Sequence, residues 1–357
     1  MPSVSNSLRP DWANLNQEEL RSTLSGLNSL QELASFWEIA PSQLSYYAFH
    51  LDKQNAYTTF RIRRRNGRQR VIEAPTPTLK YLQRLIHESL SGVYGPHRAV
   101  HGFVPGRSVV TNARNHLGRQ YVLNVDLVDF FPSITKRRIW GRLVAAPYSL
   151  NNNVANVIAS LATNVYARLP QGSPCSPVIA NMVASELDAD LTELCSRLYC
   201  RYTRYADDIT ISSSRREFPP QLARYPSAQG SGQVIIGDSL TTIIERHNFL
   251  INHRKSRLQS YWTRQTCTGI VVNSDHPSPP RRYARNVRSL LDHWRKNGWE
   301  EAAQILSEKE NRPLFQERDR LANHVLGKIA YLKMVRGQDD PIAQRLEETF
   351  RLIPSHL

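Results

Sequence analysis

The most regular feature of the chain is a hydrophobic pattern with the 3.6-residue period of amphipathic helices. It predicts helices over residues 16–49, 79–93, 153–167 and 238–248, and a helical C-terminal region over 283–357. After Pro177 one apolar face predicts a further helix; it is formed by Ile179, Met182, Val183, Leu187, Leu191, Leu194 and Leu198.

Between these helices lie short apolar runs bounded by turn residues, a pattern typical of strands. Two extended runs over residues 57–72 flank Asn66-Gly67, which is a strong hairpin signal. Residues 120–127 predict one strand, residues 199–212 a second hairpin, and residues 256–273 a strand pair. The pattern therefore predicts a mixed fold of helices and strands.

Charge and composition narrow the class of partner. The chain has 357 residues, is 40% hydrophobic and carries a formal net charge of +15, which favours a globular protein that binds a polyanion. Its cysteines form no C-x-x-C pair, so we expect free thiols and a reducing, cytoplasmic setting; they are Cys175, Cys195, Cys200 and Cys267. No apolar run is long enough to span a bilayer, and we expect no membrane partner.

Three aspartates stand where strands end or turn. Asp126 ends the strand over residues 120–127, and Asp207 and Asp208 occupy the turn of the hairpin over 199–212. Adjacent strands would bring them to one sheet edge, where carboxylates can hold two Mg²⁺ ions for phosphoryl transfer. Alone, the Asp207-Asp208 pair is equally typical of an Asx turn.

The flanking sequence favours the catalytic interpretation. YADD at residues 205–208 resembles the YxDD motif of reverse transcriptases, and NVDLVDFF at 124–131 resembles their first catalytic-acid motif. LPQGSPCSP at 169–177 resembles the PQGxxxSP motif that follows in that family. All three occur in the family's order. The resemblance implies an RNA-directed DNA polymerase, a nucleotidyltransferase with Asp126, Asp207 and Asp208 as catalytic metal ligands.

The resemblance also implies nucleotide-binding roles for six residues: Arg64, Arg70, Phe131, Gln171, Gly172 and Lys255. Phe131 matches an aromatic gate against the ribose 2′-hydroxyl, and is also an ordinary core residue by type. Gly172 lets backbone approach a ligand, or simply makes a turn. Lys255, in INHRKS at 251–256, matches a family lysine that helps to protonate pyrophosphate. The alternative interpretation is that Lys255 is an ordinary surface lysine. Which of the crowded fingertip arginines contacts triphosphate stays open.

For the other acidic residues near these motifs we expect structural roles rather than metal binding. Asp129 is expected to cap a helix or turn rather than bind metal. Glu186, Asp188 and Asp190 are expected to form a solvated helix face.

Two further motifs indicate a branch of the family. NARNH at residues 112–116 matches the NAxxH signature of retron reverse transcriptases, and CTG at 267–269 stands where that branch carries Val-Thr-Gly. LGKIAYLKM at 326–334 also resembles the branch. The resemblance implies RNA contacts by Asn112, His116, Thr268 and Gly269. The C-terminal helical region begins with a cluster of arginines, which either contact the phosphates of a duplex or form a solvated helix face; they are Arg281, Arg282, Arg285 and Arg288.

For the fold, the resemblance implies an α/β (α+β) right-hand polymerase with an antiparallel palm sheet and a helical thumb. The expected division is an N-terminal helical region at 1–52, fingers at 53–101 and 134–175, a palm at 102–133 and 176–274, and a basic thumb at 275–357. A surface insertion without periodicity is expected at about 214–234.

For function, the resemblance implies binding of a structured non-coding RNA, priming from a guanosine 2′-hydroxyl, and synthesis from dNTPs of a branched RNA–DNA (msDNA). It also implies a role in anti-phage defence with an effector protein encoded nearby. Two alternatives stay open: another group II intron-like reverse transcriptase, and a non-catalytic RNA-binding scaffold. A repair polymerase of different fold is disfavoured by the PQGxxxSP turn.

Overall fold

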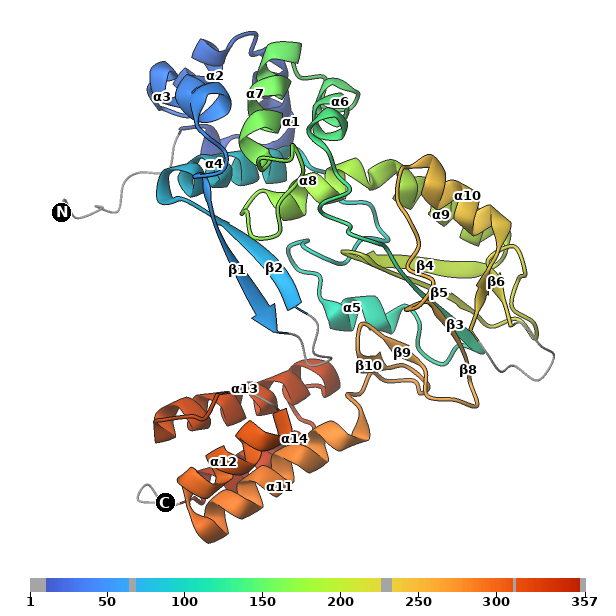
Figure 1. The fold of residues 1–357 in the computed structure, drawn as a ribbon. Helices are drawn as coiled ribbons and strands as arrows, with labels where there is room; N and C mark the ends of the chain where they lie inside the picture. Colours follow the sequence, from blue (N-terminus) through green and yellow to red (C-terminus); the bar gives the residue numbers. More distant parts are fainter. Residues whose placement is uncertain (1–10, 64–68, 226–232, 311–312, 354–357) are drawn as a thin grey trace.

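The computed structural model describes residues 11–63, 69–225, 233–310 and 313–353. The fold combines helices with one four-stranded antiparallel sheet and a long hairpin (Figure 1), so the predicted mixed fold is confirmed. Within the described ranges, no helix is long and apolar enough to cross a membrane.

The N-terminal helices pack on a central pair. They are α1 (Gln17–Gly26), α2 (Leu30–Phe36), α3 (Pro41–Ser45) and a π-helical turn η2 (Tyr46–His50). They lie against α4 (Pro77–Val93) and α7 (Asn152–Ala162). Asn16 starts α1 with a capping box: its side-chain oxygen accepts from the backbone N–H of Glu19, and the Glu19 carboxylate accepts from the backbone N–H of Asn16. Buried leucines such as Leu24 and Leu33 join these helices into the main core.

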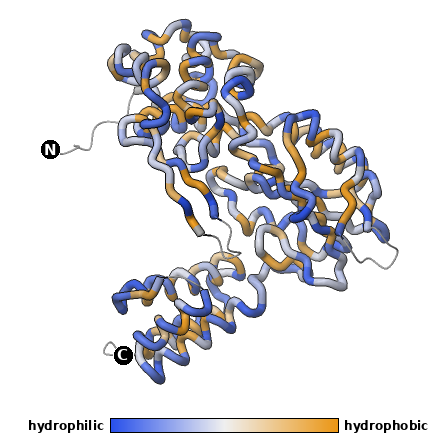
Figure 2. Tube along the Cα trace, in the orientation of Figure 1, coloured by the Kyte–Doolittle hydropathy of each residue, from blue (hydrophilic) through white to orange (hydrophobic). Residues whose placement is uncertain are grey.

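The hairpin β1 (Tyr57–Arg63) and β2 (Gln69–Pro75) projects from this helical layer toward the C-terminal helices (Figure 1). Hydrophobic and polar positions mix along it (Figure 2), and Phe60, Ile62 and Val71 are about half exposed. The predicted Asn66-Gly67 turn lies outside the described residues.

The central sheet has the strand order β4-β5-β3-β8. Its strands are β3 (Tyr121–Asp126), β4 (Cys200–Tyr205), β5 (Asp208–Ser213) and β8 (Arg257–Ser260). The helix α9 (Ser185–Arg197) packs on β4, and α10 (Asp238–Arg246) packs on α9 (Figure 1). Two short helices flank β3 in sequence, α5 (Val109–Arg114) and α6 (Lys136–Val144).

Three sequence predictions need correction. Instead of one strand pair over residues 256–273, β8 joins the main sheet beside β3, while β9 (Thr266–Cys267) pairs with β10 (Ile270–Val271). The helix after Pro177 is divided at Ala184 into α8 (Ser176–Val183) and α9. The predicted helix over 153–167 ends at Ala162, since its last residues form a loop.

The predicted surface insertion is anchored in the core. Its β6 (Ala223–Arg224) pairs with β7 (Ile235–Ile236), and Leu222 and Ala223 are fully buried in the main hydrophobic cluster. Apolar burial therefore holds both ends of this segment, although its sequence shows no period.

The C-terminal helices form a separate hydrophobic cluster centred on residues such as Leu291, Trp294 and Val325. They are α11 (Arg281–Asn297), α12 (Trp299–Glu310), α13 (Arg318–Arg336) and α14 (Pro341–Arg351). The predicted helical region is thus confirmed, while the exact subdomain boundaries stay predictions.

Candidate active site

Asp126 and Asp208 face each other across the centre of the sheet. β3 and β5 pair antiparallel, and Asp126 is the direct partner of Asp208 in the register. Side chains at paired positions of adjacent strands lie on the same face, roughly 5 Å apart at Cβ. The sheet therefore brings together two acids that are 82 positions apart in the chain.

Asp207 lies beside this pair in the β4–β5 turn. The backbone N–H of Leu127 donates to the Asp207 carbonyl at 3.1 Å, which ties the turn to the end of β3. Ala206 has φ +54, so the turn is tight and its backbone is strained. All three predicted catalytic acids are thus gathered at the same end of the two central strands.

Burial and neighbouring negative charge raise the pKa values of Asp207 and Asp208. Burial, and then the charges of Asp207 and Asp126, raises the pKa of Asp208 to about 6. Burial and the Asp126 charge also raise the pKa of Asp207. Nearby positive charge therefore does not fully balance the ionised Asp207 and Asp208, a condition that a bound cation would relieve.

Lys255 supplies one positive charge at the site. Its ammonium donates to both oxygens of Asp126, at 2.7 and 2.8 Å. The side-chain amide of Asn252 donates to Asp126 as well, at 3.1 Å, and the Asn252 backbone N–H donates to the Asp126 carbonyl at 2.8 Å. Lys255 is therefore a neighbour of the acids rather than a free surface lysine.

The donor chemistry fits a hard divalent cation, because the three acids offer carboxylate oxygens, and burial and mutual repulsion raise the pKa values of Asp207 and Asp208. Within the ranges that the structure describes, however, no three His, Cys, Asp or Glu side chains are already closed around a metal position. In this arrangement the Asp126 carboxylate forms an ion pair with the Lys255 ammonium.

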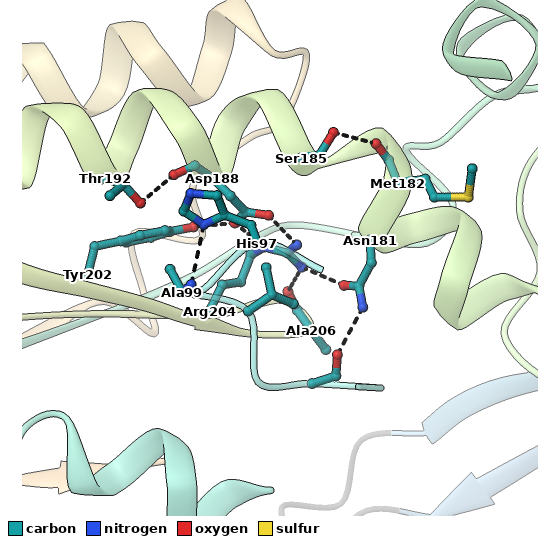
Figure 3. Close-up of polar contacts among 12 residues, drawn as sticks. His97, Ala99, Asn181, Met182, Ser185, Asp188, Thr192, Tyr202, Arg204 and Ala206 are labelled. Carbon is teal, nitrogen blue, oxygen red and sulfur yellow. Dashed lines mark hydrogen bonds and ion pairs between the residues drawn. The ribbon is translucent and has the colours of Figure 1, made fainter. Parts of the chain in front are cut away.

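A buried ion pair adjoins the turn that carries Asp207 and Asp208 (Figure 3). Arg204 donates through Nε and Nη2 to the two oxygens of Asp188, and Tyr202 donates to the same carboxylate. Arg204 also donates to the carbonyl of Ala206 at 3.0 Å. The carboxylate of Asp188 thus anchors the arginine that holds the residue preceding Asp207.

This arrangement corrects the prediction of a solvated face for Asp188, whose side chain is fully buried. Glu186 is exposed and pairs with Arg142, while Asp190 pairs with Arg246 and His247. Sequence reasoning missed Arg204 entirely. The available signal was its position two residues after Tyr202, since strand alternation places both on one face and a charge there demands a partner.

Phe131 lies close to the acids and belongs to an aromatic cluster. Its ring packs edge-on against Phe130 and Phe103, at centroid distances of 5.5 and 6.1 Å. Phe103 in turn contacts the ring of Tyr205, which precedes the catalytic turn. Phe131 is 8% exposed and so belongs to the core, while its gate role stays a prediction.

The loop after α7 binds the β1–β2 hairpin. Arg70 donates through Nε to Oε1 of Gln171 at 2.7 Å, and the Glu73 N–H donates to the Gln171 carbonyl at 2.8 Å. Gly172 has φ +136, and a Cβ there would lie 2.5 Å from the Glu73 carbonyl oxygen. Glycine is therefore required for the contact of this loop with β2. Arg64 lies outside the described residues.

Burial contradicts direct RNA contacts by Asn112 and His116, both of which have no exposed surface. His116 shares hydrogen bonds with Ser212 and Thr203, each at 2.7 Å, and burial lowers its pKa to about 3. The amide of Asn112 donates to the Cys267 sulfur at 3.2 Å. These side chains instead join α5 to the sheet and to β9.

The remaining predicted RNA-binding residues lie at the surface. Gly269 is exposed in the β9–β10 turn with φ +84, and the neighbouring Thr268 is partly exposed. Gly269 and Arg282 line the same hollow of about 530 Å³ beside the C-terminal helices. The other predicted arginines, Arg281, Arg285 and Arg288, are exposed on α11 at i, i+4 and i+7. Their RNA contacts stay predictions.

Residues 51–288 match the family model described as reverse transcriptase (RNA-dependent DNA polymerase). The chain therefore belongs to the reverse transcriptase family, and the helices and antiparallel sheet are those of its right-hand polymerase fold. Members of this family depend on divalent metal and copy an RNA template, which agrees with the carboxylate site.

Within the family, the chain is of the bacterial retron type. It is 34% identical over 300 residues to the Retron Mx162 reverse transcriptase of Myxococcus xanthus, covering 77% of this chain and 60% of that protein. Identity to the Retron Ec86 reverse transcriptase of Escherichia coli is 28% over 284 residues, covering 78% of this chain and 82% of that protein. The chain thus spans about 60% of the length of the Myxococcus relative and most of the Escherichia one.

Proposed function

We propose that the protein is an RNA-directed DNA polymerase that extends a primer with deoxynucleotides on an RNA template. The observation that carries the proposal is the register pair of Asp126 and Asp208 with Asp207 beside it. Two Mg²⁺ ions held there would activate the attacking hydroxyl and stabilise the leaving pyrophosphate. Asp126, Asp207 and Asp208 are their proposed ligands.

The residues around the acids have separate tasks in this proposal. Arg70, held by Gln171, faces a triphosphate as a planar multi-donor. Phe131 closes the space beneath the sugar and so excludes a 2′-hydroxyl. Lys255, released from Asp126 when metal binds, is placed to donate a proton to pyrophosphate.

The retron-type similarity supports a more specific reaction. The protein would bind a structured non-coding RNA, prime from a guanosine 2′-hydroxyl, and leave the DNA attached to the RNA as a branched product. We further propose that this branched RNA–DNA acts in anti-phage defence in the cytoplasm, together with an effector protein encoded nearby. The exposed arginines of α11 would grip the duplex through its phosphates.

The test is synthesis by purified protein on the structured RNA encoded beside its gene, with dNTPs and Mg²⁺ and without an added primer. The proposal expects DNA that stays attached to RNA after denaturation, and that is freed by a 2′,5′-debranching enzyme. Replacing the priming guanosine by 2′-deoxyguanosine should abolish the product. DNA made only with an added primer would favour an intron-like reverse transcriptase, and no DNA at all would favour the non-catalytic scaffold.

A further inference from the structure

A basic and aromatic hollow lies apart from the acids, between α6, α7 and the loop after α7. Its volume is about 580 Å³, and its main lining residues are Lys136, Arg137, Trp140, Asn156, Tyr166 and Arg168. α6 and α7 stand at the opposite end of the molecule from the C-terminal helices (Figure 1). None of the roles proposed above uses this hollow.

The lining carries positive charge without a matching acid. Lys136, Arg137 and Arg168 contribute three cations, and no carboxylate is among the lining residues. Across the part of the chain that the structure describes, none of these three side chains forms an ion pair. α6 begins at the hollow, so the positive end of its dipole adds to the field there. An anion is therefore the favoured ligand.

The same hollow presents two aromatic rings to solvent. Tyr166 is 74% exposed and Trp140 is 37% exposed, so both rings are accessible to a ligand. The Tyr166 loop is nevertheless well held, because the side-chain oxygen of Asn164 accepts from the backbones of Tyr166 and Arg168. Exposed rings on a fixed loop beside cations are the features that bind unpaired bases and their phosphates.

The loop is also joined to the β1–β2 hairpin and to Gln171. The Asn164 amide donates to the Glu73 carboxylate at 3.0 Å, and the Glu73 backbone donates to Gln171. A duplex held by the C-terminal helices would leave its unpaired template strand toward the opposite end of the molecule, where α6 and α7 stand (Figure 1). We propose that the hollow binds an unpaired nucleotide of the template RNA ahead of the active site, a proposal that rests on the polymerase function above.

The test compares two primer–template duplexes that share the same paired region, with template overhangs of one and of twelve nucleotides. Fluorescence anisotropy of a labelled primer measures the affinity for each. The wild-type protein should bind the long overhang more tightly. Tyr166→Ala and Arg168→Gln should each remove most of that gain, about tenfold for loss of one stacked base, and leave the short-overhang affinity unchanged.

Two surface variants elsewhere serve as matched controls. Tyr199→Ala removes a tyrosine that is 80% exposed at the start of β4, and Arg197→Gln removes an exposed arginine of α9. Both should keep the full gain. Equal losses on the two duplexes, or an overhang that adds no affinity, would each overturn the proposal. Primer extension by the wild type is measured in parallel, so a failure of the polymerase function is seen separately.

Discussion

Arg204 and Asp188 form a completely buried ion pair, with both guanidinium–carboxylate distances at 2.7 Å. The pair adjoins the Asp207-Asp208 turn and reaches it through the Ala206 carbonyl (Figure 3). A buried ion pair of this kind adds little net stability, because the cost of desolvating both charges offsets much of their attraction. Its main contribution is to fix the positions of the groups that it contacts.

Breaking this pair should damage both folding and synthesis. Asp188→Asn leaves the Arg204 charge buried and only partly satisfied, so we expect a loss of about 3–5 kcal/mol in unfolding free energy. Arg204→Lys should lose the bidentate contact and the bond to Ala206, and should lower synthesis more than it lowers stability. Chemical denaturation and primer extension measure the two effects. Full activity of folded Arg204→Lys would show that Ala206 needs no anchor.

The raised pKa values predict how stability depends on pH and metal. In the folded chain the pKa of Asp208 is about 6, above its ordinary value of 3.8, so the folded state holds the proton more tightly than the unfolded state does. Stability of the metal-free protein should therefore fall as pH rises from about 4 to about 6. Mg²⁺ should restore it, and more strongly at pH 7.5 than at pH 5, where protons compete.

Thermal unfolding with and without Mg²⁺ at the two pH values checks this prediction. Asp208→Asn is the informative variant, because it removes the repulsion. It should be at least as stable as the wild type without metal and should gain little from Mg²⁺. The same Mg²⁺ effect at both pH values, or in the variant, would contradict a carboxylate site for the ion.

Phe131→Ala should relax the choice of sugar. The ring is nearly buried against Phe103 and Phe130, so truncation opens space beside the acids. We expect ribonucleotide incorporation to rise at least about tenfold relative to deoxynucleotides, together with about 3–5 kcal/mol of lost stability from the cavity. Competition between dNTP and NTP measures the first effect. Unchanged selectivity in a destabilised variant would assign Phe131 to the core alone.

The α11 arginines should contribute salt-sensitive, sequence-independent affinity. Changing Arg281, Arg282, Arg285 and Arg288 together to Gln should reduce the slope of log affinity against log salt by up to about 3, because each phosphate contact contributes somewhat less than one unit. Cognate RNA and a scrambled hairpin should weaken alike. Arg345→Gln, on α14, is a control for net charge. A loss confined to the cognate RNA would mean that these arginines read its structure.

Local motifs predicted the site more accurately than they predicted its surroundings. Asp207 and Asp208 occupy a hairpin turn whose two strands are adjacent in sequence, so a short pattern is sufficient to define them. The burial of His116 depends on Ser212 and Thr203, about ninety residues later, and a local motif does not carry that information. For the same reason Asp188 was expected in solvent: the face of α9 that carries it is decided by packing on β4.

Strand pairing likewise depends on residues that are distant in sequence. Residues 256–273 have strand-like patterning throughout, yet only β8 finds a place in the main sheet, because β3 has a free edge there. The hollow beside Tyr166 had no signal in the sequence, since its residues come from two helices and a loop that only folding brings together.

The most direct test of the account is primer extension on an RNA template by Asp207→Asn and Asp208→Asn, with Asp129→Asn as the control. Asp129 is exposed near the site and has φ +43, a conformation that asparagine tolerates well. Loss of the metal's charge stabilisation, worth several kcal/mol, should lower synthesis by the first two variants at least about a hundredfold, with folding and RNA binding kept. The control should retain near-normal activity. Near-normal extension by both Asp207→Asn and Asp208→Asn would contradict the assignment of these acids to two-metal catalysis.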